Sequence, residues 1–444
     1  MNKIDIDTAL DDAPVTLHVL TVSFVIALAL IVDGFDIVVL GFVAPAVNAS
    51  FGLGYGGIGA VLTASLIGVA IGGFAGGYLG DLFGRRRMIG VSLLIFGVLT
   101  LLSAMATDVF LFALARLLAG FGLGVMTPNA AALLAEILPR RLRRQIMMIA
   151  YALSTIGTSL AGLLSREMLP DPGWRAIFLI GGTMPLVIAA LVSLWVPESP
   201  KFLMGRGRHA DAARVLNRLA RRMMFSGDVE FTSAEDPAAK RPLRTVFGPE
   251  YRTTTLIMAF MVFFTLFAWV AIGNWGTMVI SDLGYGIKFA ASVMTLYNLA
   301  GLVCALATSF VLYKWGSKWI FITFSGVSVL ASLGIYSVAG EISEGVIILY
   351  VVVSGAVLTA LLQASYPVAA EAFPTSSRAS GVGFAFGFGR LGAVTSSAVT
   401  AAVVKFGGIT AFFLQIAIAS FFIMVAAVAF RQHLQGKSRS VSDH

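Results

Sequence analysis

Long apolar runs alternate with short polar breaks along nearly the whole chain. Each run is close to the roughly 20 residues that an α-helix needs to cross the hydrocarbon core of a bilayer. Divided at the polar breaks, the pattern predicts twelve membrane-spanning helices, over residues 18–43, 56–78, 88–107, 109–136, 145–165, 175–196, 253–280, 288–312, 319–339, 345–370, 380–404 and 409–430. We therefore expect an all-α membrane protein.

The longest polar stretch, residues 197–252, separates two sets of six predicted helices. A repeat supports this division, because Ala135-Glu136-Ile137-Leu138-Pro139 followed by Arg143 matches Ala370-Glu371-Ala372-Phe373-Pro374 followed by Arg378. Both copies end equivalent helices, so the halves should run in the same direction, related by an axis along the membrane normal. The expected organisation is a tail (1–17), a six-helix bundle (18–196), a linker (197–252), a second bundle (253–430) and a second tail (431–444).

Within the linker, residues 210–222 have a helical pattern with Ala213, Leu216 and Leu219 on one face and arginines on the other. Such an amphipathic segment is typical of a helix lying on the inner membrane surface. A solvated linker helix is the alternative.

Composition and charge support a membrane protein with both termini in the cytoplasm. The 444 residues are 58% hydrophobic and 12% charged, with a mean hydropathy of +0.90, which excludes a water-soluble protein of this size. Cytoplasmic termini place 25 of the 31 Lys and Arg residues on the inner side, as the positive-inside rule requires. Topology and lipid headgroups explain the net charge of +8, so we expect no nucleic-acid binding. The acidic N-terminal segment predicts no removable signal peptide, and the lone Cys304 cannot form an intrachain disulfide.

Two carboxylates, Asp33 and Asp36, interrupt the first apolar run. A charged residue at the centre of a membrane helix costs roughly 3 kcal/mol on insertion scales, so both should face a wet cavity or a countercharge. Counted at 1.5 Å per residue, Asp36 and Arg116 lie at similar depths and can interact. We favour Asp33 as the proton carrier, with Asp36 second and a static buried ion pair as the alternative.

Four glycines, Gly68, Gly72, Gly76 and Gly80, recur every fourth residue in the second predicted helix. This spacing puts them on one face, which predicts a smooth ridge where another helix approaches closely.

Three motifs resemble those of the major facilitator superfamily of secondary transporters. They are Gly77-Tyr78-Leu79-Gly80-Asp81-Leu82-Phe83-Gly84-Arg85-Arg86 (G-x-L-x-D-x-x-G-R-R), Arg116-x-x-x-Gly120-x-x-x-Gly124, and Pro197-Glu198-Ser199-Pro200-Lys201-Phe202-Leu203. Within the superfamily the chain resembles the aromatic acid:proton symporters, through Asp33-Gly34-Phe35-Asp36 and the region from Tyr366-Pro367 to Gly389-Arg390-Leu391-Gly392. The acidic residue that the family usually repeats after span eight is absent from Tyr313-Lys314-Trp315-Gly316-Ser317-Lys318.

Charged residues at the predicted inner helix ends are candidates for gating. We expect Asp81 to form an exchangeable latch with Arg85 and Arg86, with an ordinary helix cap as the alternative. Glu136 and Glu371 lie beside arginines such as Arg378 and are interpreted as helix-end ion pairs, with proton transfer through Glu136 as a lesser alternative.

Arg390 is our preferred anchor for a substrate carboxylate. Its planar guanidinium can donate two parallel N–H hydrogen bonds to a carboxylate, and it keeps its positive charge throughout the transport cycle. Arg116 competes for this role, and pairing of Arg390 with carbonyl groups or Glu371 is the structural alternative. The remaining candidates for substrate contacts are Asn274, Trp275, Gln363 and Tyr366.

The resemblance implies proton-driven uptake of a small aromatic carboxylate, such as a benzoate or hydroxybenzoate, across the bacterial inner membrane by alternating access. The expected partners are protons, the substrate and the bilayer, with no cofactor or metal, and the protein should be a monomer. An enzyme is not expected, because the four histidines are dispersed and no H-E-x-x-H or G-x-S-x-G motif occurs. A transporter of another organic acid or sugar, or a drug/proton antiporter, is the alternative.

Overall fold

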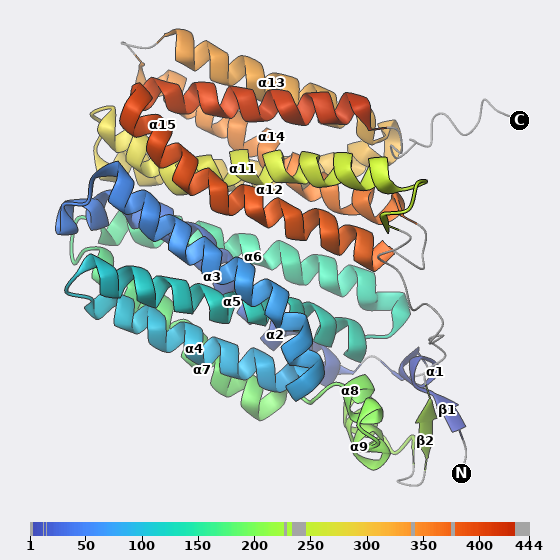
Figure 1. Cartoon of the computed structure of the whole chain (residues 1–444). Coiled ribbons are helices and arrows are strands. Elements are labelled where there is room, and N and C mark those ends of the chain that lie inside the picture. Colours follow the sequence, from blue (N-terminus) through green and yellow to red (C-terminus); the bar gives the residue numbers. More distant parts are fainter. Residues whose placement is uncertain are drawn as a thin grey trace, which may run out of the picture. The chain divides into compact units, whose positions relative to one another are not determined.

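The computed structural model describes residues 3–11, 13–14, 16–225, 229–232, 246–338, 342–373 and 378–430 (Figure 1). Long helices dominate these residues. They are α2 (Leu17–Phe51), α3 (Gly54–Phe83), α4 (Arg85–Met105), α5 (Val109–Ile137), α6 (Arg140–Met168), α7 (Trp174–Trp195), α11 (Arg252–Asp282), α12 (Ile287–Trp315), α13 (Ser317–Ser337), α14 (Glu344–Glu371) and α15 (Arg378–Ala429).

The helix positions agree with those expected from the apolar runs. Every predicted span overlaps one of these helices along most of its length, and the last two spans share α15, where Gly408 breaks the helix with φ 76°. In the described part of the chain, ten helices are long and apolar enough to cross a membrane, with α15 counted once. Helix α6, which holds the predicted span 145–165, is outside that set, so twelve crossings stay a prediction.

The chain forms two compact units, and the first contains Met1–Ile37, Ala64–Leu160 and Arg175–Pro237. Its apolar core is built from α2, α4, α5 and α7, with buried side chains such as Val22, Ile26, Leu93, Leu123 and Val192. This core holds the part of α2 up to Ile37, which carries the acidic pair, against α5.

Helices α3 and α5 pack through the predicted glycine ridge. A Cβ atom on Gly68 would lie 1.9 Å from the carbonyl oxygen of Leu117, and one on Gly72 would lie 2.2 Å from that of Phe121. Glycines of α5 face α3 in return, because a Cβ on Gly124 would lie 2.3 Å from the carbonyl oxygen of Val69. The predicted close helix approach is therefore confirmed, and it also explains the glycines that follow Arg116 in the second motif.

The second unit contains Val38–Thr63, Ala161–Trp174 and Ala238–His444. Within it α11 packs along α15, α12 packs along α14, and α13 contacts both α14 and α15. The ends of three earlier helices join this unit. Gly41 of α2 meets Asn274 of α11, where an added Cβ would lie 2.6 Å from the Asn274 Cα, and Gly162 of α6 meets Thr295 of α12. In this conformation, parts of the first six helices therefore pack with the last six.

A small fold joins the N-terminal tail to the linker, and we call it the tail–linker fold. It consists of β1 (Lys3–Asp5), α1 (Ile6–Asp11), α8 (Pro200–Gly205), α9 (His209–Ala220) and β2 (Glu230–Thr232). The two strands pair in parallel, and Ile6, Leu10, Leu203, Leu216 and Phe231 form a buried cluster beneath them.

The expectation that the linker helix lies on the membrane surface is corrected by this packing. The apolar face of α9 is covered by protein, because Ala213 and Leu216 are buried in the tail–linker cluster and Leu219 in the core of the first unit. Burial against protein removes these side chains from contact with lipid.

Candidate functional site

The acidic pair on α2 flanks a point where two helix backbones touch. A Cβ atom on Gly34 would lie 1.9 Å from the carbonyl oxygen of Ser154 on α6, and one on Gly157 would lie 1.8 Å from that of Ile31. Glycine at both positions permits this crossing of α2 and α6. The crossing fixes the rotation of α2, and with it the directions of Asp33 and Asp36.

Asp36 forms a buried ion pair with Arg116 of α5. The Nη2 atom of Arg116 lies 2.5 Å from Oδ1 of Asp36, and the two side chains are 0% and 3% exposed. The guanidinium also lies 3.4 Å from the hydroxyl of Thr100 and 5.4 Å from the centre of the Phe178 ring. The interaction expected from helix depth is confirmed, and in this conformation it commits Arg116 to Asp36.

Asp33 has a different environment from Asp36, although both come from the same helix. It is only half-buried, and its carboxylate accepts a hydrogen bond of 3.2 Å from the hydroxyl of Thr127 on α5. Asp33 is therefore the more accessible of the two carboxylates.

The candidate gating residues form a charge network where α3 turns into α4. Arg85 lies 2.6 Å from Asp81 and 3.4 Å from Glu136 at the end of α5. The carboxylate of Glu198 accepts hydrogen bonds from the backbone N–H of Arg86, at 3.0 Å, and of Ser199, at 2.9 Å. The first and third motifs recognised in the sequence thus meet in the first unit.

Other parts of the gating set differ from this network. The guanidinium of Arg86 donates to the backbone carbonyl of Ser193 and, within the described residues, does not pair with Asp81. Glu371 is exposed at the end of α14, and the side chain of Arg378 lies outside the described residues. The sequence motif gave no sign that Glu198 would hold the α3–α4 turn.

A second group of polar and aromatic residues lies in the second unit, on α14 and α15. Arg390 is half-buried on α15, and in the described part of the chain it has no hydrogen bond or ion pair. One turn earlier, Phe386 stacks on Tyr366 of α14, with ring centres 3.8 Å apart and planes inclined by 13°. Because a short connection makes α14 and α15 antiparallel, exposed Gln363, one turn before Tyr366, lies about level with Arg390.

Asn274 and Trp275 differ from these residues because both are buried in this conformation. The Trp275 ring lies 6.4 Å from that of Tyr55 on α3, whose hydroxyl donates a 2.7 Å hydrogen bond to Asp282. These residues therefore belong to the packed contacts of α11 with α2 and α3. The sequence analysis did not single out Tyr55 or Phe386, because nothing in the local pattern distinguishes either ring from the other aromatic residues of the chain.

Long apolar helices that carry a buried ion pair and a further half-buried guanidinium define a multi-pass membrane protein with charged groups inside its membrane segments. Residues 26–341 match the sequence profile of the Major Facilitator Superfamily, and the chain belongs to this superfamily of transporters. The resemblance inferred from the motifs is therefore confirmed.

Alignments with transporters from Pseudomonas putida cover most of the chain. A gallate transporter of Pseudomonas putida is 30% identical over 431 residues, which cover 96% of this chain and 95% of that protein. A 4-hydroxybenzoate transporter of the same organism is 29% identical and covers 88% of each chain. The crystal structure of a D-xylose-proton symporter has the same fold, with a TM-score of 0.74 over 95% of this chain and 99% of that chain at 18% identity.

Proposed function

We propose that this protein is a symporter that takes up a small aromatic carboxylate together with protons, across the cytoplasmic membrane of a bacterium and as a monomer. The observation that carries the proposal is the environment of Arg390, a half-buried cation without a protein partner in the described ranges. It lies one helical turn from the stacked rings of Tyr366 and Phe386. An aromatic carboxylate needs this combination of a fixed positive charge and an aromatic surface.

Arg390 is the better anchor of the two arginines considered from the sequence. Arg116 already holds Asp36 in a fully buried pair, so binding of a substrate there would require that pair to break. Arg390 can present its planar fork to a carboxylate without breaking a hydrogen bond or an ion pair to any described residue. Gln363, about level with it, supplies an amide for a ring hydroxyl group.

Proton coupling is assigned to Asp33. Its carboxylate is half-buried and accepts a hydrogen bond from Thr127, whereas the carboxylate of Asp36 is fully buried in its pair with Arg116. Protonation of Asp33 removes a negative charge from the membrane interior before the loaded carrier changes conformation. The Asp36–Arg116 pair then serves as a fixed connection between α2 and α5.

Alternating access requires the packed contacts in the second unit to open. The contacts of α2 and α3 with α11, at Gly41–Asn274 and Tyr55–Asp282, are the ones that would separate when the opposite side of the carrier opens. Burial of Trp275 in this conformation fits a role in that closure. A contact with substrate would then arise only in the other conformation.

Transport in proteoliposomes tests the proposal. With an imposed inward pH gradient, the wild-type protein should accumulate labelled 4-hydroxybenzoate, and unlabelled benzoate and gallate should compete while xylose should not. Competition by xylose alone would instead support a sugar transporter. Accumulation that does not depend on the gradient would contradict proton coupling.

The substrate anchor is tested by Arg390→Gln, which should raise KM by about ten- to a hundredfold, because a hydrogen bond to a charged group contributes about 1.5–3 kcal/mol. Arg390→Lys should give an intermediate value, because it retains the charge and loses the fork. Lys405→Gln, an exposed position on the same helix, is the matched control for loss of one positive charge. A KM for Arg390→Gln equal to that of the control would exclude the anchor.

The proton carrier is tested by Asp33→Asn, which should abolish gradient-driven accumulation but retain exchange of labelled for unlabelled substrate. Glu167→Gln is the matched control, because its side chain is exposed and, among the residues that the structure describes, pairs with the neighbouring Arg166 alone. Normal accumulation by Asp33→Asn would remove Asp33 from the mechanism.

A further inference from the structure

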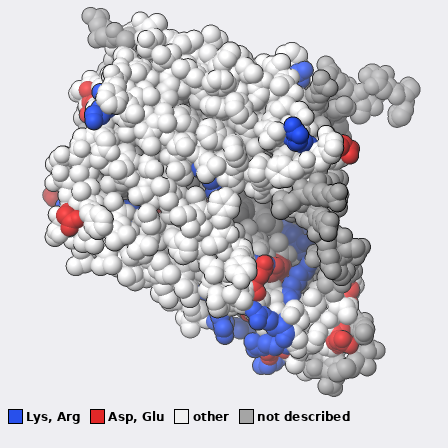
Figure 2. Space-filling view, in the orientation of Figure 1, with Lys and Arg blue, Asp and Glu red and all other residues white. Residues whose placement is uncertain are grey.

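A pocket lined by arginines lies in the first unit where α3, α4, α8 and α9 meet. Its volume is about 580 Å³, within the usual range for small-molecule sites. Six guanidinium groups line it, from Arg86, Arg87, Arg206, Arg208, Arg214 and Arg218. Figure 2 shows Lys and Arg side chains gathered over α8 and α9, while most of the visible surface over the long helices is uncharged. We call this site the arginine pocket.

The arginine pocket has more positive charge than its own acids can balance. Only Glu198 and Asp211 contribute carboxylates, so six positive charges face two negative ones and four remain in excess. Asp211 already pairs with Arg208 and Arg214, and Glu198 accepts backbone N–H groups. Crowded like charges repel one another, and a bound anion would relieve this repulsion.

Two of the arginines, Arg87 and Arg218, are available to bind that anion. Arg206 and Arg86 already have protein partners, because Arg206 donates to the carbonyl of Leu82 and lies over the ring of Phe202, and Arg86 donates to the carbonyl of Ser193. The side chains of Arg87 and Arg218 are exposed and make no hydrogen bond or ion pair within the described residues.

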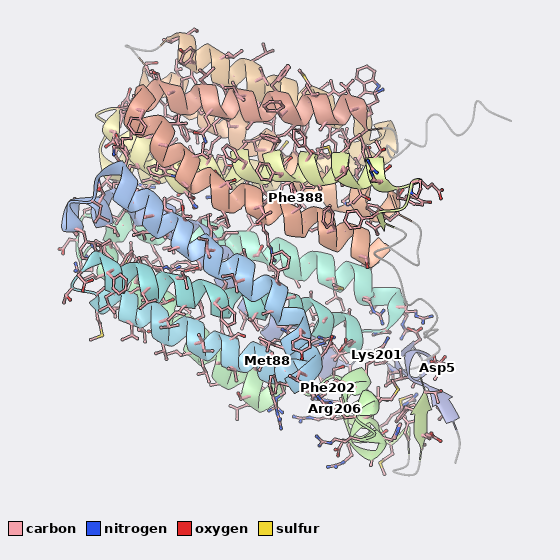
Figure 3. The ribbon with its side chains drawn as sticks, in the orientation of Figure 1. Asp5, Met88, Lys201, Phe202, Arg206 and Phe388 are labelled. Carbon is pink, nitrogen blue, oxygen red and sulfur yellow. The ribbon has the colours of Figure 1, made fainter. Side chains whose placement is uncertain are left out.

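The pocket also has an apolar side that continues from a membrane helix. Leu82 and Phe83, the last residues of α3, line it and are 41% and 49% exposed. Figure 3 shows Phe202 and Arg206 beside the turn between α3 and α4, near Met88. Basic side chains next to apolar ones at the end of a membrane helix are typical of sites for anionic lipid headgroups.

We propose that the arginine pocket binds a phosphate group, with Arg87 of α4 and Arg218 of α9 as its principal ligands. A phosphate presents several oxygens to arginine forks and accepts bidentate hydrogen bonds from more than one side. The anionic headgroup of a phospholipid and a soluble phosphate compound share this chemistry. A phosphate bound to both arginines would tie the linker helix to the start of α4. This site is separate from the proposed transport site and does not depend on it.

Binding to the full-length protein, purified in detergent and stripped of lipid, tests the proposal. The probes are phosphatidylglycerol, measured by native mass spectrometry, and inorganic phosphate, measured by calorimetry. The double variant Arg87→Gln/Arg218→Gln should bind at least one probe about tenfold or more weakly than the wild type, because it loses two charge-assisted contacts. Arg222→Gln, which removes an exposed positive charge outside the pocket lining, should bind like the wild type.

The pattern of losses identifies the source of the phosphate. Weakened binding of phosphatidylglycerol, without competition by inorganic phosphate, assigns the site to a lipid headgroup. Weakened binding of inorganic phosphate assigns it to a soluble ligand. Unchanged binding of both probes in the double variant, or an equal loss in Arg222→Gln, would overturn the proposal. If the double variant does not remain monodisperse, each single variant replaces it, and a smaller loss in both single variants gives the same answer.

Discussion

The contact between α3 and α5 gives the sharpest test of the packing, through the substitution Gly68→Ala. The added Cβ atom would lie 1.9 Å from the carbonyl oxygen of Leu117, and its three nearest neighbours are backbone atoms that cannot rotate away. Relief of this overlap requires the helices to move apart by about 1 Å, which also loosens the contact at Gly72. Overpacking of a well-packed interior costs typically 1–3 kcal/mol, and we expect the upper part of that range because backbone must shift.

Thermal stability in detergent, followed by size-exclusion chromatography after heating, measures the effect. Gly90→Ala on α4 is the matched control, because its Cβ atom would meet only the Ser193 hydroxyl, at 3.9 Å. Both substitutions gain the same helix propensity, so Gly68→Ala should melt several degrees below the control. Equal melting temperatures for the two variants would refute the close packing of α3 on α5.

Two further predictions concern the charged groups of the first unit. Asp36→Asn should destabilise the protein by about 3–5 kcal/mol, because it leaves a buried guanidinium unpaired. The double variant Asp36→Asn/Arg116→Gln should recover part of this loss. Additive losses in a thermal double-mutant cycle would contradict direct pairing. Asp81→Asn should slow uptake in proteoliposomes, because it removes the Asp81–Arg85 latch. Expression should not fall, because Asp81 is 68% exposed and an exposed pair contributes less than about 1 kcal/mol to stability. Unchanged uptake kinetics would exclude the latch.

The parts of the fold that could be predicted are those with a local signal. The apolar runs located the long helices, because the thickness of the bilayer's hydrocarbon core sets the length of each run. The period of four from Gly68 to Gly80 predicted a close helix contact, because residues at this spacing share a face. The rise of 1.5 Å per residue placed Asp36 and Arg116 at similar depths in their helices, which predicted the ion pair that the structure contains.

The parts that could not be predicted depend on contacts between distant segments. The strands β1 and β2 have three residues each, too few for a period, and they pair across most of the first half of the chain. The covered face of α9 has the same amphipathic pattern as a helix on a membrane surface, so the pattern alone could not distinguish the two. Phe386 was missed because a chain with 33 phenylalanines gives no reason to select one.

Pairing of β1 with β2 also sets an order for assembly. During synthesis the N-terminal strand emerges first, but its partner at Glu230–Thr232 is made only after α2 to α9. The N-terminal strand can therefore pair only after this first group of helices has been synthesised, so its docking is a late step of folding. A bulky tag fused directly to the N-terminus would crowd this late step, so a C-terminal tag is the safer choice for producing the protein.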